Sequence, residues 1–314
     1  MTADYQSAVD AAVAGARPLC HGGKVADYIP ALAAVDPDQL GLAVATVEGE
    51  VFYAGDAQTP FSIQSVSKVF TLAMVLERVG DALWSGVGRE PSGTAFNSIV
   101  QLEAEQGIPR NPFVNAGAII VTDRLIGAAS AEATVADILA FMRDRCSDDG
   151  ASIDRSVARS ESETGARNRS LAHFMAAFGN LQHPVETVLE VYFHQCALSL
   201  SCRQLVQAAA FLANDGRDIP SGDQIVSAER CRRLNAVMMT CGHYDNSGEF
   251  AYRVGLPGKS GVGGGILAVA PGRGVVAAWS PALNGAGTSL AGAAAIEAFT
   301  SAVGWSVFEG RPVR

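Results

Sequence analysis

Hydrophobic residues recur along the chain at two different spacings. Residues 41–47 and 51–55 are two β-rich runs, and a short segment containing glycine separates them, which predicts a hairpin. Residues 265–270 and 274–280 repeat this arrangement around a Pro-Gly-Arg turn. We therefore expect antiparallel strands near both ends of the chain.

Helical spacing dominates the region between the two hairpins. Val66, Val69, Phe70 and Ala73 recur at steps of three and four residues, which places them on one face of a helix over residues 65–79. The same pattern predicts further helices over residues 134–145, 185–196, 201–214, 228–241 and 288–303. The middle of the chain is thus expected to be mostly helical.

Strands at both ends with helices between them predict an α+β fold in a single domain spanning residues 1–314. One economical arrangement joins the two ends into one antiparallel sheet flanked by helices. The sheet-containing lobe would then comprise about residues 1–70 and 245–314, and a helical lobe about residues 71–244. A cleft between the two lobes is the expected ligand site.

Composition narrows the classes of partner. The chain has 314 residues, of which 48% are hydrophobic and 18% charged, so it can bury a sizeable core. Its net charge of -9 and its lack of a basic run argue against nucleic acid or an anionic membrane as partner. No basic N-terminal region precedes an apolar stretch, and no apolar run reaches the length of a membrane span. We expect a cytoplasmic protein.

The cysteines and histidines show no metal-binding pattern. The six cysteines are spread along the chain without a Cys-x-x-Cys pair, which predicts buried free thiols. None of the five histidines belongs to a His-x-x-x-His or His-Glu-x-x-His motif. We therefore expect no metal site and no cofactor.

Lysine is scarce, because arginine has taken over most basic positions. The chain contains only Lys24, Lys68 and Lys259. Arginine stays protonated in proteins, whereas lysine loses its proton when burial or a neighbouring cation lowers its pKa. Each lysine is therefore a candidate functional residue, although an ordinary solvated lysine is an equally good interpretation of any one of them.

Two short motifs suggest a catalytic role for two of these lysines. Ser65 and Lys68 are three residues apart at the start of a predicted helix, so the hydroxyl and the ammonium lie on one face. A serine nucleophile needs such a base. Lys259 belongs to a Lys-Ser-Gly triplet at the second hairpin, where it would be a second cation that lowers the pKa of Lys68. Together the motifs match the layout of penicillin-recognising serine acylases.

More of the chain resembles one family, the glutaminases with a β-lactamase-like domain. The resemblance runs in order from about residue 23 to the C-terminal helix. It is carried by residues 23–30 (GKVADYIP), 61–70 (FSIQSVSKVF), 111–118 (NPFVNAGA), 161–164 (ESET) with Arg167 and Asn168, and 258–265 (GKSGVGGG).

The resemblance implies a penicillin-binding/β-lactamase-like fold and hydrolysis of L-glutamine to L-glutamate and ammonia. Ser65 would be the nucleophile and Lys68 its base, while the backbone N–H groups of Ser65 and Val262 would form the oxyanion hole. The residues implied to hold the substrate are Tyr28, Asn115, Glu161, Asn168, Tyr192 and Tyr244. Tyr192 and Tyr244 are also implied to relay protons near the nucleophile, and Gln64 to support the pocket beside it. A homodimer or homotetramer is expected from the same resemblance.

The chemistry of free glutamine agrees with these roles. Its ammonium group calls for a carboxylate such as Glu161, and its α-carboxylate calls for donors such as Tyr28, Asn115 or Asn168. The alternatives are another acyl-serine amidase or esterase, a β-lactam-binding protein, and a non-catalytic sensor that keeps the pocket. The chain has no Ser-Asp-Asn triplet, so the segment around Tyr192 is expected at the position that this triplet has in β-lactamases.

Overall fold

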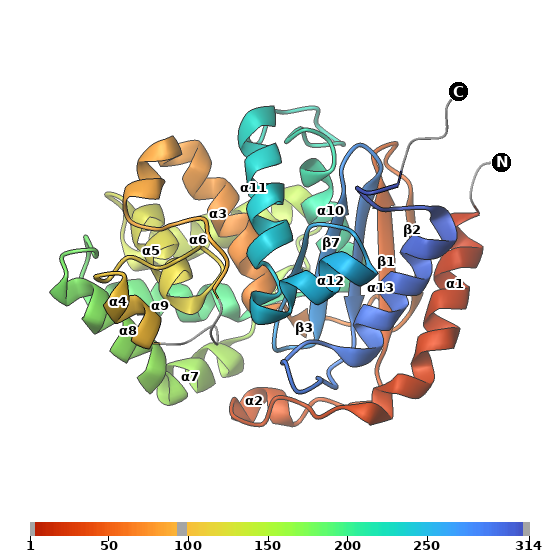
Figure 1. Ribbon diagram of the computed structural model, residues 1–314, viewed down its shortest axis with the longest axis horizontal. Coiled ribbons are helices and arrows are strands. Elements are labelled where there is room, and N and C mark those ends of the chain that lie inside the picture. Colours follow the sequence, from red (N-terminus) through yellow and green to blue (C-terminus); the bar gives the residue numbers. More distant parts are fainter. Residues whose placement is uncertain (1–3, 93–98, 310–314) are drawn as a thin grey trace.

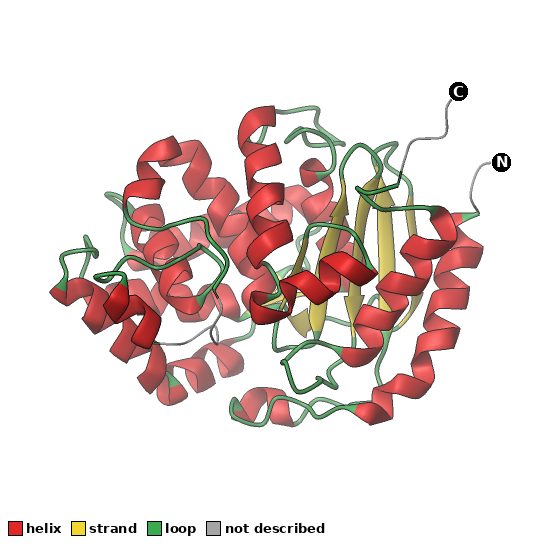
Figure 2. Cartoon of the chain, viewed as in Figure 1, coloured by secondary structure: helices red, strands yellow, loops and turns green. Residues whose placement is uncertain are grey.

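The structure is a computed structural model that describes residues 4–92 and 99–309. Two lobes lie side by side, a sheet covered by helices and a lobe built almost entirely of helices (Figures 1 and 2). Both described ends of the chain belong to the sheet lobe (Figure 1). The predicted α+β fold is confirmed.

One five-stranded antiparallel sheet unites the two ends of the chain. Its strands follow the order β2-β1-β8-β7-β6. The central pair joins the N-terminal hairpin to the C-terminal one, with Gly41 opposite Trp279 and Thr46 opposite Gly274. The strands are β1 (Gly41–Thr46), β2 (Val51–Gly55), β6 (Gly258–Ser260), β7 (Gly265–Ala270) and β8 (Gly274–Trp279). Both predicted hairpins are therefore confirmed.

The sheet is buried on both faces because its strands alternate between two hydrophobic cores. Leu42 and Val44 of β1 face the core beneath α1 and α13, whereas Ala43 and Ala45 face the core shared with α10 and the helical lobe. This double burial explains why the strands are nearly continuous apolar runs. The helices of the sheet lobe are α1 (Tyr5–Ala16), α10 (Cys202–Ala209), α12 (Ser247–Arg253) and α13 (Leu290–Val303). The short helix α2 (Pro30–Ala33) packs against residues 155–164 of the helical lobe.

The structure contains each predicted helix, with shifts at some ends, and the helical lobe also holds helices that the apolar spacing did not predict. The helices of this lobe are α3 (Ser67–Val79), α4 (Val100–Ala104), α5 (Asn115–Ile126), α6 (Ala131–Cys146), α7 (Arg155–Thr164), α8 (Ala166–Ala177), α9 (Val185–Cys196) and α11 (Ala228–Cys241). Helices α9 and α11 have the predicted bounds. The predicted helix over residues 134–145 begins earlier, because the Ser130 hydroxyl accepts the Ala133 N–H and caps α6. The helix expected over residues 201–214 ends at Ala209 and continues only as a 3-10 turn.

A second, very small sheet lies beside the start of α3. It has the order β3-β5-β4 and consists of β3 (Phe61–Ser62), β4 (Ser152–Ile153) and β5 (Leu198–Leu200). This sheet was not predicted from the sequence, because strands of two or three residues are too short to show a periodicity. The Ser62 hydroxyl donates to Cys196 O at 3.0 Å, which ties the segment before Ser65 to the end of α9.

No single helix within residues 4–92 and 99–309 has the length and apolar character to cross a membrane. Helices α5 and α6 meet these criteria only as a pair, and they are bent by 101° at the break between them. Each of the six cysteines is buried and carries a free thiol, as predicted.

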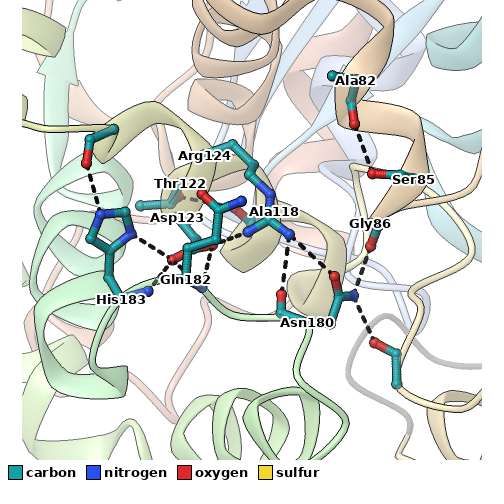
Figure 3. Close-up of polar contacts among 12 residues, drawn as sticks. Ala82, Ser85, Gly86, Ala118, Thr122, Asp123, Arg124, Asn180, Gln182 and His183 are labelled. Atoms are coloured by element: carbon teal, nitrogen blue, oxygen red, sulfur yellow. Dashed lines mark hydrogen bonds and ion pairs between the residues drawn. The ribbon is translucent and has the colours of Figure 1, made fainter.

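A buried carboxylate anchors the loop before α9 to α5 (Figure 3). Asp123 is fully buried and accepts the backbone N–H groups of Gln182 and His183, the latter at 2.9 Å. It also forms an ion pair with Arg124, whose guanidinium donates to Asn180 Oδ1 at 3.2 Å. These bonds fix α5, which begins at Asn115, relative to α9, which carries Tyr192.

His183 completes this network as a cation. Its Nδ1 lies 2.9 Å from Asp123 Oδ1 and its Nε2 lies 2.8 Å from Gly127 O. Both partners are acceptors, so only the imidazolium form donates to both. Burial lowers the pKa of His183, but the hydrogen bonds and the charge of Asp123 outweigh burial and raise it above its ordinary value.

Replacing His183 by glutamine should destabilise the protein most at acidic pH. Because the folded state raises the pKa, the stabilisation is fully present below the ordinary value of 6.5 and is lost as pH rises through the folded-state pKa. Urea denaturation should show a large difference in the free energy of unfolding between native protein and variant at about pH 5.5, and a smaller difference at about pH 9. The matched control is the exposed His173→Gln. If the loss of unfolding free energy in His183→Gln did not change with pH, the stabilising role of the His183 charge would be contradicted.

Candidate active site

A cavity of about 230 Å³ lies where the two lobes meet. Its walls combine segments that are far apart in the sequence, from the N-terminal signature to the turn between β6 and β7. The predicted residues that line it are Tyr28, Gln64, Ser65, Asn115, Glu161, Asn168, Tyr192 and Val262. The other three, Lys68, Tyr244 and Lys259, are buried in the protein close to this wall.

Ser65 occupies a tight turn between β3 and α3. The residue spacing predicted that Ser65 lies in the first helical turn, but α3 begins at Ser67, and residues Gln64–Val66 form a 3-10 turn before it. Gln64 has a φ of 49°, in the left-handed region that non-glycine residues seldom adopt. Such conformations cost roughly 1–3 kcal/mol and persist only where the surrounding structure enforces them. Here the turn holds the Ser65 side chain at the cavity wall.

The glycines after Lys259 allow a second backbone segment to approach this turn. A Cβ on Gly261 would stand 2.7 Å from Ile63 O, and a Cβ on Gly263 would stand 2.3 Å from Ser62 O. Only glycine permits this contact. The glycine-rich segment therefore brings Val262 into the same cavity wall as Ser65.

Lys68 lies one helical turn after Ser65 and is only 1% exposed. Its ammonium donates to Phe113 O at 3.1 Å and to Asn115 Oδ1 at 2.8 Å. Those bonds use two of the three N–H donors of an ammonium group. Burial lowers the pKa of Lys68 to about 8, against the opposing charges of Cys196 and Glu161. A fraction of Lys68 is thus neutral near neutral pH.

Lys259 is the second buried lysine, and Lys24 is the ordinary exposed one. Lys259 Nζ donates to Gly242 O at 2.8 Å and lies 4.1 Å from the centre of the Tyr244 ring. From the sequence, Lys259 was expected to lower the pKa of Lys68. In the structure burial has that effect on Lys68, while burial and the charge of Lys68 hold the pKa of Lys259 well below its ordinary value.

Two buried tyrosines flank the serine. Tyr244 has a φ of 57°, and its hydroxyl is hydrogen-bonded to the Ser65 side chain. Tyr192 is hydrogen-bonded to the Cys196 thiol and lies at the cavity wall. Burial raises the pKa of both phenols, so both remain neutral at physiological pH. Neutral phenols can donate and accept a proton along a hydrogen-bonded chain.

Polar groups of both lobes suit the charged end of an amino acid. Glu161 is 7% exposed, and burial raises its pKa to about 7, opposed by a hydrogen bond from Gln64 and by the charge of Lys68. Asn115 Nδ2 donates to Asn168 Oδ1 at 3.0 Å, which joins α5 to α8 at the cavity. Tyr28 is 55% exposed.

Sequence reasoning missed five residues that line the cavity. These are Ile29, Thr164, Gly165, Arg167 and Cys196. All but Cys196 lie within or directly beside the segments that carry the family resemblance. Cys196 is four residues after Tyr192, so helical spacing alone puts both on one face of α9. No cluster of His, Cys, Asp or Glu in the described parts of the chain could hold a metal ion.

Comparisons with known proteins agree on one family. A family model described as glutaminase matches residues 23–308. A glutaminase of Rhizobium rhizogenes is 58% identical over 306 residues, covering 98% of this chain and 99% of that protein. A thermolabile glutaminase of Rhizobium etli is 57% identical, with the same coverage.

Solved structures give the same result. The probable glutaminase ybaS has a TM-score of 0.93 and 39% identity, with 98% of both chains covered. A probable glutaminase from Bacillus subtilis, complexed with 6-diazo-5-oxo-L-norleucine, has a TM-score of 0.88 and 31% identity, again with 98% of both chains covered.

Proposed function

Because this chain belongs to the glutaminase family, we propose that it cleaves the side-chain amide of L-glutamine through an acyl-enzyme on Ser65. Its overall reaction is the hydrolysis of L-glutamine to L-glutamate and ammonia. The observation that carries the proposal is the position of Ser65, which lies in a strained turn at the cavity wall. Its hydroxyl is hydrogen-bonded to Tyr244, and Lys68 lies one turn further along.

In acylation, Ser65 Oγ attacks the amide carbon and neutral Lys68 takes the serine proton. The lowered pKa of Lys68 makes this transfer accessible near neutral pH. The backbone N–H groups of Ser65 and Val262 stabilise the oxyanion, since both residues are at the cavity wall. The carbon–nitrogen bond then breaks, and the proton held by Lys68 leaves with ammonia.

In deacylation, water replaces Ser65 as the nucleophile, and Lys68 again transfers the proton. Neutral Lys68 takes a proton from water, the resulting hydroxide attacks the glutamyl ester, and the proton returns to Ser65 Oγ. L-Glutamate is then released. Tyr244 is hydrogen-bonded to Ser65, and Tyr192 lies near Lys68, with the ammonium 5.9 Å from the ring centre. We assign both phenols to orienting and relaying protons, because burial keeps them neutral.

The amino-acid end of glutamine selects the substrate. Its ammonium pairs with Glu161, and its α-carboxylate accepts bonds from the amides of Asn115 and Asn168 and from the Tyr28 hydroxyl. An incoming ammonium also stabilises the ionised form of Glu161, whose pKa is otherwise raised to about 7. Gln64 supports this wall, since its amide is hydrogen-bonded to Glu161 and donates to the Ser62 hydroxyl at 3.0 Å.

The fold is proposed to be of the penicillin-binding/β-lactamase-like type. Ser65 lies in the turn just before α3, Lys68 lies in the first turn of α3, and Lys259 lies on β6, an edge strand of the main sheet. That combination supports the proposal. The oligomeric state, a homodimer or homotetramer, and the cytoplasmic location stay predictions from the sequence.

Covalent labelling tests the nucleophile directly. Incubation with 6-diazo-5-oxo-L-norleucine, a glutamine analogue that loses dinitrogen when its diazo carbon alkylates a nucleophile, should modify the peptide that contains Ser65. Excess L-glutamate should slow the labelling, and Ser65→Ala should abolish it. Peptide mass spectrometry locates the added mass. A modification found instead on Cys196, the thiol in the same cavity, would contradict Ser65 as nucleophile.

A further inference from the structure

A second cavity, of about 670 Å³, lies on the far side of α7 from the active site. It is a groove between α6 and α7, floored by β4 and by His194 of α9. Its volume falls within the usual range of small-molecule sites, roughly 300–1,000 Å³. None of its lining residues belongs to the active-site cavity.

Helix α7 separates the two cavities. Glu161 and Thr164 line the active site, whereas Arg155, Ala158 and Ser162 line the groove. With 3.6 residues per turn, the groove residues centre on one side of the helix, whereas Glu161 and Thr164 lie toward the other side. The groove is thus a separate site that shares one wall with the glutamine pocket.

The groove combines an apolar wall with a cationic rim. Val135 and Leu139 of α6 and Ile153 of β4 supply the apolar surface, and all three are partly buried. Arg143, Arg155 and Arg159 surround it, against one carboxylate, Glu132. In a chain with a net charge of -9, this local excess of positive charge is unusual.

These arginines are available to a ligand. Arg155 and Arg159 are exposed and form no ion pair with any residue that the structure describes. Arg143 is held in place, since its Nε donates to Ala151 O at 2.9 Å. His194 Nδ1 bonds to Glu190 O at 2.7 Å and must be the donor there, which leaves Nε2 to act as an acceptor or, when protonated, a further donor.

We propose that the groove between α6 and α7 binds an amphipathic organic anion, whose acid group contacts the arginines and whose apolar body lies against α6. Guanidinium groups suit carboxylates because they offer paired donors in one plane. The apolar wall adds affinity in proportion to the surface that it removes from water. The arginines alone would also bind a simple inorganic anion, and the apolar wall alone would also bind a neutral apolar molecule. The two together select a ligand that has both an acid group and an apolar body.

Calorimetric titration with octanoate, kept below its micellar concentration, tests this proposal. Octanoate should bind the native protein at one site, and saturating L-glutamate should leave its affinity unchanged, because the product occupies the other cavity. The double variant Arg155→Gln/Arg159→Gln should bind octanoate about tenfold more weakly, since both guanidinium groups lose their exposed ion pairs with the octanoate carboxylate. Both side chains are exposed, so the variant should fold and keep its glutamine turnover.

The matched control removes two arginines that are exposed elsewhere, Arg203→Gln/Arg232→Gln, and should bind octanoate as the native protein does. Octanamide, which has no charge, should bind at least tenfold more weakly than octanoate. The proposal is overturned if octanoate does not bind, if L-glutamate displaces it, if both double variants bind equally well, or if octanamide binds as tightly.

Discussion

Replacing Ser65 by alanine should lower kcat for L-glutamine hydrolysis by at least about 10³-fold. The substitution removes the oxygen that forms the acyl-enzyme in the proposed mechanism, and no other hydroxyl in the cavity occupies the turn before α3. The side chain is small and the change leaves the backbone turn in place, so the thermal midpoint should stay close to that of the native protein. Ammonia release, measured in a coupled assay, gives the rate.

Ser67→Ala is the matched control for this change. Ser67 is fully buried two residues away, and its hydroxyl has no hydrogen-bond partner in the structure described. Its removal therefore takes away no hydrogen bond and should leave kcat within a few fold of native. If Ser65→Ala retained most of the activity, or if Ser67→Ala lost as much of it, the assignment of the nucleophile would be wrong.

Replacing Lys68 by methionine should lower kcat by roughly 10²–10⁴-fold, the usual contribution of a general base. Methionine occupies a similar volume without a basic atom. The substitution leaves Phe113 O and Asn115 Oδ1 without their ammonium donor, but it also removes a buried cation, so the two effects on stability oppose each other. Lys24→Met, an exposed lysine on the surface, should retain native turnover.

The pH profile of kcat/KM separates a base from a merely structural lysine. Lys68 must be neutral to accept a proton and its pKa is lowered to about 8, so activity should rise as pH increases through that value. Glu161 must be ionised to bind an ammonium, and its pKa is raised to about 7, which adds a rise at lower pH. In Lys68→Met only the rise due to Glu161 should remain, displaced to higher pH because the Lys68 charge that lowers the pKa of Glu161 is gone. A variant profile with the native shape would exclude Lys68 as the base.

The sequence predicted the main elements because their signals are local. The two hairpins and helices such as α9 and α11 follow from the spacing of apolar residues, and each spacing is set within the element itself. The scarcity of lysine was also informative. Of the three lysines, the two that the motifs singled out are buried beside the cavity, and Lys24 is exposed.

Other elements needed the tertiary structure. Helix α1 was not predicted, and its buried residues gain their environment from β1, β2 and α13. The strands β3, β4 and β5 are defined only by pairing with one another. Such short segments carry no periodic signal, because their conformation depends on partners that are distant in sequence.

For the active site too, some features were determined by the sequence and others by the tertiary structure. The sequence by itself determined the chemical groups: a serine and lysine at helical spacing, a second lysine before a glycine-rich segment, and the acid and amides of the family segments. Only the tertiary structure decided that Ser65 lies in a strained 3-10 turn, that Gly261 and Gly263 contact the backbone of that turn, and that burial lowers the pKa of Lys68. The reason is physical, since strain, close backbone contact and desolvation depend on which distant segments surround a residue, whereas residue type and spacing are properties of the chain alone.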